Sequence, residues 1–323
     1  KGHENTQTIG DKRLPFDDAE IAAGWLQRHR RTGAGLSFGG AANRPTSFAF
    51  TGADALRACG GSLLIDGRAS TSMTTDSRAV LDDCVFVALS GDRFDGNKFV
   101  AESIDSGAAG VVCATGRGQA HVEIARAAGA WLLEVDDTLV ALGDLCRAHR
   151  RQYDRPVVGI TGSNGKTTIK ELTALTLGAA GPVLATRANH NNRIGVPQTL
   201  ARLRGGQRFA VVEMGTSELG EIAELARIAE PTVGVITNIA EAHLEGLGSV
   251  EAVAAEKGAL LQSLSADATA IAPADEPLLS ELLASLPCRV LTFGRGEGAD
   301  VCLASDIVVQ GFSQRFDVRV VDT

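Results

Sequence analysis

The stretch VVGITGSNGKTT, which runs from Val157 to Thr168, decides the fold of this chain. Its first residues form an apolar, β-branched run that predicts a buried strand, a glycine-rich turn follows, and the last residues begin a helix. Consecutive backbone N–H groups at a helix start, with the helix dipole behind them, form a cradle for anions. The stretch therefore predicts a phosphate-binding loop between a strand and a helix.

The residue types in this loop suit a nucleotide. The Lys166 ammonium would reach the outer phosphates, and the Thr167 hydroxyl would bind Mg²⁺. The strict pattern G-x-x-x-x-G-K-[ST] is not met, because Ile160 lies five residues before Gly165, and the shorter form T-G-x-x-G-K-T-T stands instead. A glycine turn with a helix-starting lysine is the alternative, but the strand before and the helix after are the context that a phosphate loop requires. The predicted nucleotide-binding residues are Gly162, Ser163, Asn164, Gly165, Lys166, Thr167 and Thr168.

Alternating strands and helices continue beyond the loop. Strands are predicted at 157–161, 183–185, 209–214, 233–238, 269–272 and 290–293, and helices at 166–179, 196–203, 217–228, 250–263 and 276–286. Apolar strands with intervening helices predict a mostly parallel sheet with helices on both faces. Such sheets bind ligands beyond the carboxyl ends of their strands, so the chemistry is expected after Thr161, Met214 and Asn238.

A smaller α/β domain is predicted before this sheet. Strands are expected at 62–65, 84–89, 110–113 and 130–135, with helices at 97–106 and 139–150. The predicted fold class is therefore α/β, with a small domain over 51–150 and a P-loop-type, mostly parallel domain over 151–323. Residues 1–27 form a polar tail with a short helix predicted over 17–27, and 28–50 have the Gly- and Ala-rich composition of a linker.

Composition narrows the class of protein. Of the 323 residues, 44% are apolar, which is ordinary for a soluble globular protein. The net charge of −8 argues against nucleic acid as a partner. The six cysteines include no C-x-x-C pair, which argues against a disulfide framework or a zinc knuckle. Because no apolar run could span a bilayer and the N-terminus lacks the apolar core of a signal peptide, the sequence predicts a cytoplasmic protein.

Three further residues are candidates for the chemistry around the loop. Glu213 lies at the carboxyl end of a strand, where a carboxylate can hold the same Mg²⁺ as Thr167. His243 follows another strand end, and its spacing alone leaves a structural and a metal-binding role open. Lys257 lies in a predicted helix, where spacing alone indicates only a solvated lysine.

Together these segments resemble the Mur ligases. TGSNGKTT at 161–168 is similar to the ATP loop of that family, and RANHNNRIGVP at 187–197 to its asparagine-rich segment. EMG at 213–215, NIAEAHL at 238–244 and EKG at 256–258 resemble its later motifs, while TDSR at 75–78, FVAL at 86–89 and GDRFDG at 91–96 resemble its nucleotide-sugar-binding region. The match covers about Thr51 to the end, and its motifs agree in order and spacing.

The resemblance implies an ATP-dependent amide ligase of peptidoglycan precursor synthesis, on the branch that joins D-alanyl-D-alanine to UDP-N-acetylmuramoyl-tripeptide through an acyl phosphate. It implies ATP and two Mg²⁺ as cofactors and a carbamylated Lys257, which requires a lysine of lowered pKa. The implied catalytic residues are Lys166, His243 and Lys257, and the implied metal ligands are Thr167, Glu213, His243 and Lys257. Asn191 and Asn192 would join the loop in binding ATP, and Thr75, Asp76, Ser77, Arg78, Asp95 and Gly96 would bind the UDP substrate.

The two ends of the chain carry separate expectations. Lys1–Glu4 and Phe16–Asp18 resemble the C-terminal end of MurE, the Mur ligase that adds the third peptide residue, which predicts a covalent fusion to MurE. A tag or a chance similarity is the alternative. The chain stops at Thr323, so the third, C-terminal ligase domain of the family is expected to be absent and the last sheet elements incomplete.

Two other functions remain open from the sequence. Folylpolyglutamate synthetase shares the ATP loop and the metal chemistry, although the segment at 75–78 and the whole first domain argue against it. A non-catalytic nucleotide-binding module, retained for its fusion partner, is the alternative outside the enzymes.

Overall fold

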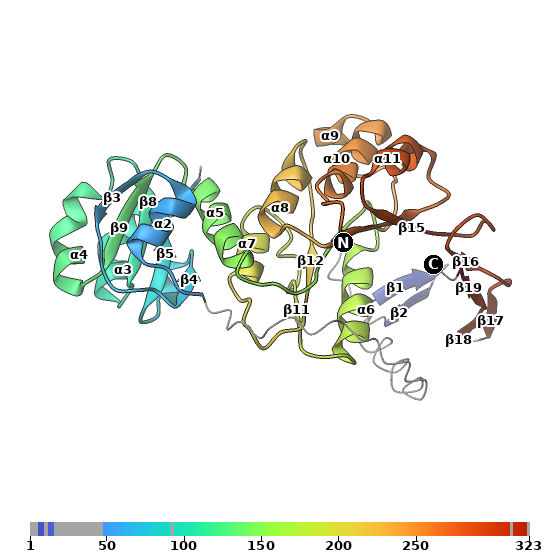
Figure 1. The fold of residues 1–323 in the computed structure, drawn as a ribbon, viewed down its shortest axis with the longest axis horizontal. Helices are drawn as coiled ribbons and strands as arrows, with labels where there is room; N and C mark the ends of the chain where they lie inside the picture. Colours follow the sequence, from blue (N-terminus) through green and yellow to red (C-terminus); the bar gives the residue numbers. More distant parts are fainter. Residues whose placement is uncertain (1–5, 10–11, 16–47, 92–93, 311–312, 322–323) are drawn as a thin grey trace. The chain divides into compact units, whose positions relative to one another are not determined.

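The computed structural model describes residues 6–9, 12–15, 48–91, 94–310 and 313–321, which divide into two units (Figure 1). The small unit holds Phe38–Arg155 and Arg193–Arg208, and the large unit holds Lys1–Ser37, Pro156–Asn192 and Phe209–Thr323. Most of the predicted MurE-like tail and linker lies outside the described residues. Of the tail, only an antiparallel pair is described, β1 (Thr6–Ile9) and β2 (Lys12–Pro15).

An eight-stranded sheet forms the centre of the large unit. Its strands, in spatial order, are β11 (Val183–Ala185), β12 (Phe209–Glu213), β10 (Val157–Thr161), β13 (Val233–Ile236), β14 (Thr269–Pro273), β15 (Arg289–Gly294), β16 (Val301–Leu303) and β19 (Val318–Val320). All neighbours are parallel except β16 and β19. A separate antiparallel pair is β17 (Val308–Gln310) with β18 (Ser313–Arg315). Every residue of the central strand β10 is buried, which explains its unbroken apolar sequence.

Helices cover both faces of this sheet. They are α6 (Lys166–Gly178), α8 (Glu221–Ala229), α9 (Leu244–Leu247), α10 (Val250–Gln262) and α11 (Ser280–Ser285), the last preceded by the 3-10 turn η4 (Pro277–Leu279). Because successive strand residues point to opposite faces, Val158 and Ile160 pack in one cluster with Ile169 of α6. The intervening Gly159 faces α10 on the other side of the sheet. A Cβ atom added to Gly159 would lie 3.1 Å from Cδ1 of Leu260. The predicted fold class, a mostly parallel sheet covered on both faces, is confirmed.

The small unit contains a five-stranded sheet. Its spatial order is β3 (Ser62–Ile65), β9 (Trp131–Val135), β8 (Gly110–Ala114), β5 (Cys84–Val87) and β4 (Ser72–Thr74), with only the β3–β9 pair antiparallel. Its α-helices are α2 (Gly52–Cys59), α3 (Val100–Asp105), α4 (Val122–Ala128), α5 (Thr138–Arg150) and α7 (Gly195–Leu200). Short elements are η1 (Ser77–Ala79), the pair β6 (Ser90–Gly91) and β7 (Phe94–Asp95), η2 (Gly96–Phe99) and η3 (Gln119–His121). The sequence predicted β3, β5, β8, β9 and α5, and helices where η2 with α3 and α7 lie, but not α2, α4 or β4.

Two segments join the small unit from outside the range predicted for it. Phe48 and Phe50 are 1% and 3% exposed, and Phe50 pairs with Ser70 in a β-bridge. The segment 193–208 also belongs to this unit. It contacts α5, because the carbonyl oxygen of Leu203 lies 3.0 Å from the ring nitrogen Nε2 of His149. Both contacts join residues that are far apart in the chain, so local sequence patterns do not reveal them.

Two features of the described residues concern membranes and disulfides. None of their helices is both long and apolar enough to cross a membrane. The six cysteines are free thiols.

We expect Gly110→Ala to destabilise the small unit. A Cβ atom at residue 110 would lie 2.0 Å from Cε2 of Trp131, whose side chain is fully buried. Overpacking a core costs about 1–3 kcal/mol, so the free energy of unfolding in urea should fall by about that amount. Gly178→Ala is the control, because no atom lies within 4 Å of its Cβ position. It should leave stability unchanged or raise it by at most about 1 kcal/mol. Equal stability of the two variants would contradict the packing described here.

Candidate active site

The loop between β10 and α6 contains two glycines with positive φ and leads to an uncapped helix start. Gly162 and Gly165 have φ values of 150° and 75°, a region that glycine adopts readily. A Cβ atom at Gly162 would lie 1.9 Å from Oγ1 of Thr237, so only glycine fits there. No side chain caps α6 at Gly165, which leaves the amino end of the helix open to a ligand.

The segment after β13 holds this loop in place. Thr237 Oγ1 donates a hydrogen bond of 2.6 Å to the Asn164 carbonyl oxygen. The backbone N–H groups of Ser163 and Asn164 donate to the carbonyl oxygen and to Oδ1 of Asn238, at 3.0 and 2.9 Å. Ser163 Oγ also donates to the Ala240 carbonyl oxygen at 2.8 Å. The sequence marked Asn238 as a predicted strand end and as part of a family motif, but it gave no sign that Asn238 shapes the loop.

Lys166 lies folded over the loop that it follows. Its Nζ donates to the carbonyl oxygens of Gly162 and Ser163, at 2.8 and 3.4 Å. Burial lowers the pKa of Lys166, and the nearby carboxylate of Glu213 acts in the opposite direction. A cation with few protein partners therefore lies at the place where the outer phosphates were predicted.

The buried carboxylate of Glu213 brings together three segments. Glu213 is 2% exposed at the carboxyl end of β12. Thr167 Oγ1, at the start of α6, lies 3.0 and 3.3 Å from its two carboxylate oxygens. Asn191 Nδ2 donates to Oε1 at 2.9 Å. The structure thus places together two predicted metal ligands, Thr167 and Glu213, and adds Asn191. The neighbouring Asn192 is exposed, and Thr168 is half-buried.

Lys257 is a fully buried lysine in the large unit. It lies on α10 and is 1% exposed. Burial and the nearby Lys166 ammonium lower its pKa to about 8, against the opposing effect of Glu256. Buried ammonium groups are normally paired, so Lys257 is not the solvated lysine that spacing alone indicated.

His243 lies on the surface of the large unit. It precedes α9 with φ 53° and ψ 36°, an uncommon backbone conformation for a residue other than glycine, and it is exposed. Within the described parts of the chain, no three His, Cys, Asp or Glu side chains are grouped so that they could hold a metal ion. The metal-ligand role predicted for His243 therefore stays a prediction.

The predicted substrate residues Asp76 and Arg78 form a preset pair in the small unit. Arg78 Nε and Nη2 donate to the two oxygens of Asp76 at 2.9 and 2.8 Å, and Asp76 also accepts the Arg78 backbone N–H. These hydrogen bonds lower the pKa of Asp76 to about 2. The Arg78 side chain is 87% exposed, so its guanidinium is held in place and open to a ligand. Ser77 lies between them in η1, and Gln198 donates to Oγ1 of Thr75 at 2.9 Å.

Asp95 organises a second polar group. It accepts hydrogen bonds from the backbone and side chain of Asn97, from Ser90 and from Arg117. The adjacent Gly96 leaves no room for a side chain, because a Cβ would lie 2.5 Å from the carbonyl oxygen of residue 89. Neither Asn97 nor Arg117 was predicted from the sequence to be a site residue. The order of the strands would have signalled Arg117, since it follows β8 at the sheet edge where β4 and β5 also end.

Two family models match the chain. The model described as the Mur ligase family, catalytic domain, matches residues 70–150. The model described as the Mur ligase middle domain matches residues 160–323, about half of the chain. The chain belongs to the Mur ligase family. The first match lies in the small unit, and the second contains most of the large unit with the phosphate loop and Glu213.

Several curated Mur ligases and their solved structures are similar to this chain. The UDP-N-acetylmuramoyl-tripeptide--D-alanyl-D-alanine ligase of Synechocystis sp. is 40% identical over 71% of this chain and 49% of its own length. The enzyme of the same name from Escherichia coli is 40% identical over 63% of this chain and 43% of its own. The crystal structure of MurF from Acinetobacter baumannii superposes with a TM-score of 0.74 at 30% identity, over 85% of this chain and 59% of that one.

A second structure of the same type was solved with a nucleotide. MurF ligase from Thermotoga maritima in complex with ADP has a TM-score of 0.67 at 30% identity, over 77% of this chain and 56% of that one. The chain spans about half the length of the curated relatives it matches.

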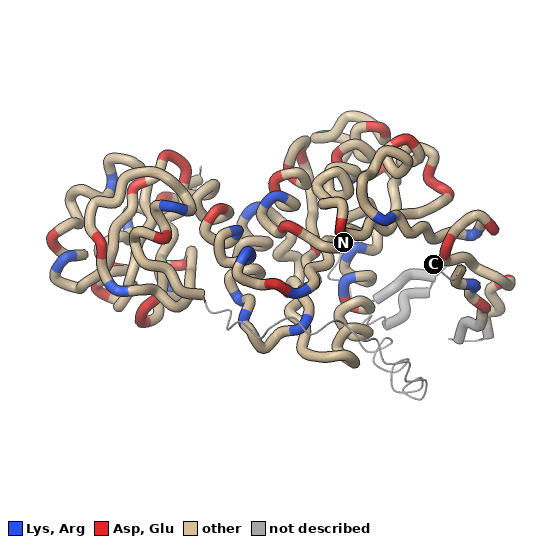
Figure 2. The backbone as a smooth tube through the Cα atoms, in the orientation of Figure 1, with Lys and Arg blue, Asp and Glu red and all other residues tan. Residues whose placement is uncertain are grey.

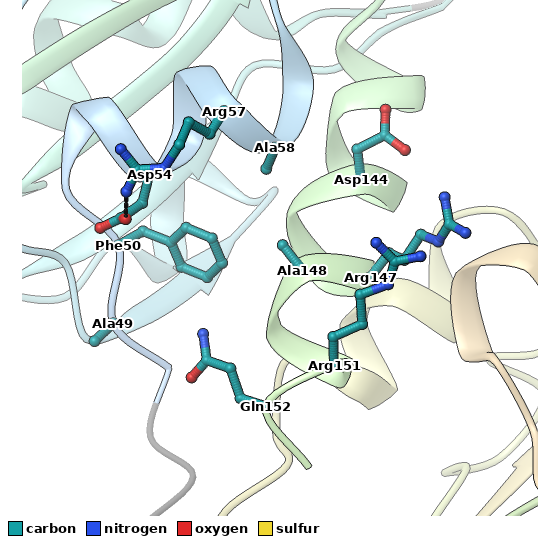
Figure 3. Close-up of a pocket in the computed structure, with 10 residues that line it drawn as sticks. All are labelled: Ala49, Phe50, Asp54, Arg57, Ala58, Asp144, Arg147, Ala148, Arg151 and Gln152. Carbon is teal, nitrogen blue, oxygen red and sulfur yellow. Dashed lines mark hydrogen bonds and ion pairs between the residues drawn. The ribbon is translucent and has the colours of Figure 1, made fainter. Parts of the chain in front are cut away.

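The small unit of this Mur ligase chain also contains a pocket apart from the predicted substrate residues (Figure 3). Its volume is about 400 Å³, and it lies between residues of α2 and α5. Its lining holds three arginines and two aspartates, so positive and negative groups are mixed there, as they are over both units (Figure 2). The lining residues are Ala49, Phe50, Asp54, Arg57, Ala58, Asp144, Arg147, Ala148, Arg151 and Gln152.

We expect Arg78→Ala to raise the pKa of the Asp76 carboxyl from about 2 toward its ordinary value of about 3.9. The side-chain hydrogen bonds from Arg78 are the main cause of the depressed pKa, while the backbone N–H of residue 78 would still donate. A ¹³C NMR titration of the aspartate carboxyl groups measures the change. An Asp76 pKa that stays at about 2 in the variant would show that the pair does not exist in solution.

Proposed function

We propose that this chain carries the nucleotide-binding and carboxylate-activating part of a ligase that joins D-alanyl-D-alanine to UDP-N-acetylmuramoyl-tripeptide in cytoplasmic peptidoglycan precursor synthesis. The observation that carries the proposal is the buried Glu213 carboxylate beside the phosphate loop, in contact with Thr167 and Asn191. The names of the relatives support the substrates, and the ADP in the Thermotoga structure supports the nucleotide.

The residues present fit a magnesium nucleotide. Mg²⁺ prefers oxygen ligands, and the Thr167 hydroxyl and Glu213 carboxylate supply them at the edge of the loop. A bound Mg²⁺ would neutralise charge on the phosphate oxygens of ATP. The amino end of α6 and the Lys166 ammonium would bind the same phosphates from the protein side. We propose that a second Mg²⁺ would be held by His243 and by the oxygens of a carbamate on Lys257, the modification described below.

The proposed reaction has two steps. A carboxylate oxygen of the tripeptide attacks the γ-phosphorus of ATP, and the bond between that phosphorus and the β-phosphate oxygen breaks. ADP departs, and the tripeptide now carries an acyl phosphate. The amine of D-alanyl-D-alanine then attacks the acyl carbon, loses a proton, and phosphate departs. Because the first step brings two anions together, electrostatic stabilisation is its main requirement. Lys166 supplies a cation at the loop for this purpose.

The small unit would bind the UDP part of the substrate. Arg78 is exposed and oriented by Asp76, and a guanidinium fork matches the oxygens of a phosphate. Thr75, Ser77, Asp95 and Gly96 complete the proposed binding residues. The Arg78→Ala variant described above should also weaken the binding of UDP-N-acetylmuramoyl-tripeptide in a calorimetric titration, and unchanged affinity would contradict this role.

We also propose a covalent link to MurE, which the resemblance of Lys1–Glu4 and Phe16–Asp18 supports. The length of the native polypeptide tests it, since a protein without a MurE segment would rule the link out.

The direct test of the function uses a protein of the full length of the relatives. Continuous ADP release over many turnovers should require both UDP-N-acetylmuramoyl-tripeptide and D-alanyl-D-alanine, and mass spectrometry should find the pentapeptide product. ADP release that ignores the UDP substrate would refute the proposed reaction.

We expect Lys166→Ala to abolish ATP binding by this chain without changing its fold. The ammonium lies in the loop and contacts only backbone carbonyl oxygens there, so its loss removes charge from the proposed phosphate site and little packing. Isothermal titration with ATP and Mg²⁺ measures the binding, and circular dichroism checks the fold. Lys98→Ala, at an exposed lysine of the small unit, is the control and should bind as the wild type does. ATP affinity that survives in Lys166→Ala would remove Lys166 from the site.

We further propose that Lys257 reacts with CO₂ to form a carbamate. The neutral amine adds to the carbon of CO₂ and releases a proton, which turns a buried cation into an anion. The neutral amine is scarce well below its pKa of about 8 and predominates above it. The carbamate would then attract Lys166, whose ammonium now lowers the pKa of Lys257.

At a fixed concentration of dissolved ¹³CO₂, we expect a carbamate NMR signal that grows as the pH rises through about 8. The reason is the growing fraction of neutral Lys257 amine. Lys257→Ala should lack the signal, and Lys98→Ala should keep it. A signal that persists in Lys257→Ala would place the carbamate on another amine.

A further inference from the structure

Glu256 is a buried carboxylate that the proposed mechanism does not use. It is 5% exposed and precedes Lys257 on α10. Its Oε1 accepts the backbone N–H of Ile222 and its Oε2 that of Gly220, each at 2.7 Å. Thr216 Oγ1 lies 3.2 Å from Oε1. These partners are 34 to 40 residues away in the chain, so the contacts are tertiary.

The partners of Glu256 form the beginning of α8. Gly220 precedes this helix and has no side chain, so no local side chain caps it. The first N–H groups of a helix lack partners within the helix, and the helix dipole favours negative charge at that end. Glu256 therefore caps α8 from a different helix, α10.

Thr216 connects this cap to the Glu213 cluster. It lies three residues after Glu213, and between them Gly215 donates its N–H to the Asn191 carbonyl oxygen at 2.8 Å. A Cβ at Gly215 would lie 2.8 Å from Cγ of Asn191, so the segment packs tightly there. The residues that follow β12 are thus held by Asn191 on one side and by Glu256 on the other. These contacts connect α10 to the segment that follows Glu213.

We infer that Glu256 is a positioning residue: it fixes α10, and with it Lys257, against the segment that follows β12, so that Lys257 stays beside Lys166 and Glu213 stays on Thr167. Hydrogen bonds from N–H groups to a carboxylate are stronger than those between neutral groups. Loss of a residue that orients metal-binding groups typically costs about 10- to 100-fold in metal affinity. The inference rests on the proposed function for its ligand, whereas the cap itself does not depend on that ligand.

The variant Glu256→Gln tests the positioning role through nucleotide binding. The variant keeps the shape of the side chain but loses its negative charge. Its amide NH₂ group is a donor, so one of the two backbone N–H groups loses its acceptor. We expect the Kd of ATP in Mg²⁺ to rise about 10- to 100-fold. The Kd of ATP in EDTA should stay unchanged, because it depends on the phosphate loop. A general loss of stability would weaken ATP binding equally in Mg²⁺ and in EDTA. Equal weakening in the two conditions, or an unchanged Kd in both, would overturn the inference.

Glu221→Gln is the matched control. Glu221 Oε2 accepts the backbone N–H groups of Ser217 and Glu218 in the same segment, at 2.6 and 3.0 Å. It belongs to α8 itself and does not join that helix to α10. Its variant should keep the Mg²⁺ dependence of ATP binding. If Glu256→Gln folds poorly, Thr216→Val is the second variant. It removes the hydroxyl contact to Glu256, together with the contacts to the Glu218 carbonyl oxygen and to Glu221, and should reduce the same Mg²⁺ dependence.

Hydrogen exchange tests the inference without any nucleotide. In Glu256→Gln, we expect faster exchange at the amides of Gly220 and Ile222, across residues 213–216, and at the start of α10. Exchange in β10 should not change. Unchanged exchange at Ile222 would disprove the cap, and faster exchange confined to the start of α8 would disprove the coupling. If the wild-type chain binds no magnesium nucleotide, the proposed function fails, while exchange still decides the role of Glu256.

Discussion

The buried carboxylate of Glu213 is the contact on which the rest of the site depends. A carboxylate that is 2% exposed must have hydrogen-bond partners, because a buried charge without them is unstable. Thr167 and Asn191 supply those partners from two segments that are separate in sequence. The requirement to satisfy one carboxylate therefore joins the start of α6, the asparagine-rich segment and the end of β12. The parallel sheet makes this meeting possible, because β10 and β12 are neighbours and end at the same edge.

The charges around this contact are unbalanced in a way that suits an anionic ligand. Lys166 and Lys257 are both buried enough for their pKa values to be lowered, and each ammonium repels the other. The carboxylate of Glu256, next to Lys257 in the chain, accepts hydrogen bonds from the N–H groups at the start of α8. A nearby third lysine, Lys170, is paired with Glu171 and the Thr186 carbonyl oxygen. Positive charge that the fold leaves incompletely neutralised lies beside an open helix start, which is the electrostatic condition for binding phosphate.

The small unit applies the same principle at its own sheet edge. Arg78 and Arg117 follow strands whose carboxyl ends lie together, and each is oriented by an aspartate, Asp76 or Asp95. An arginine that is already held by a carboxylate loses less freedom when it binds a phosphate than one that moves freely. The pocket between α2 and α5 lies elsewhere and contains none of these residues.

The sequence by itself determined the strand–loop–helix unit, the parallel sheet and the family. These features depend on local patterns: β10 and β11 begin and end where the apolar runs predicted, and the phosphate loop lies within one continuous stretch. Only the tertiary structure decided which side chains meet. The fold buries Lys257, where helix spacing alone indicated a solvated lysine and only the family resemblance marked it as a candidate. The contacts of Glu256, Asn238 and Arg117 were also outside the reach of the sequence. A hydrogen bond between residues 22 or more positions apart follows from the packing of helices and strands, and no local pattern records it.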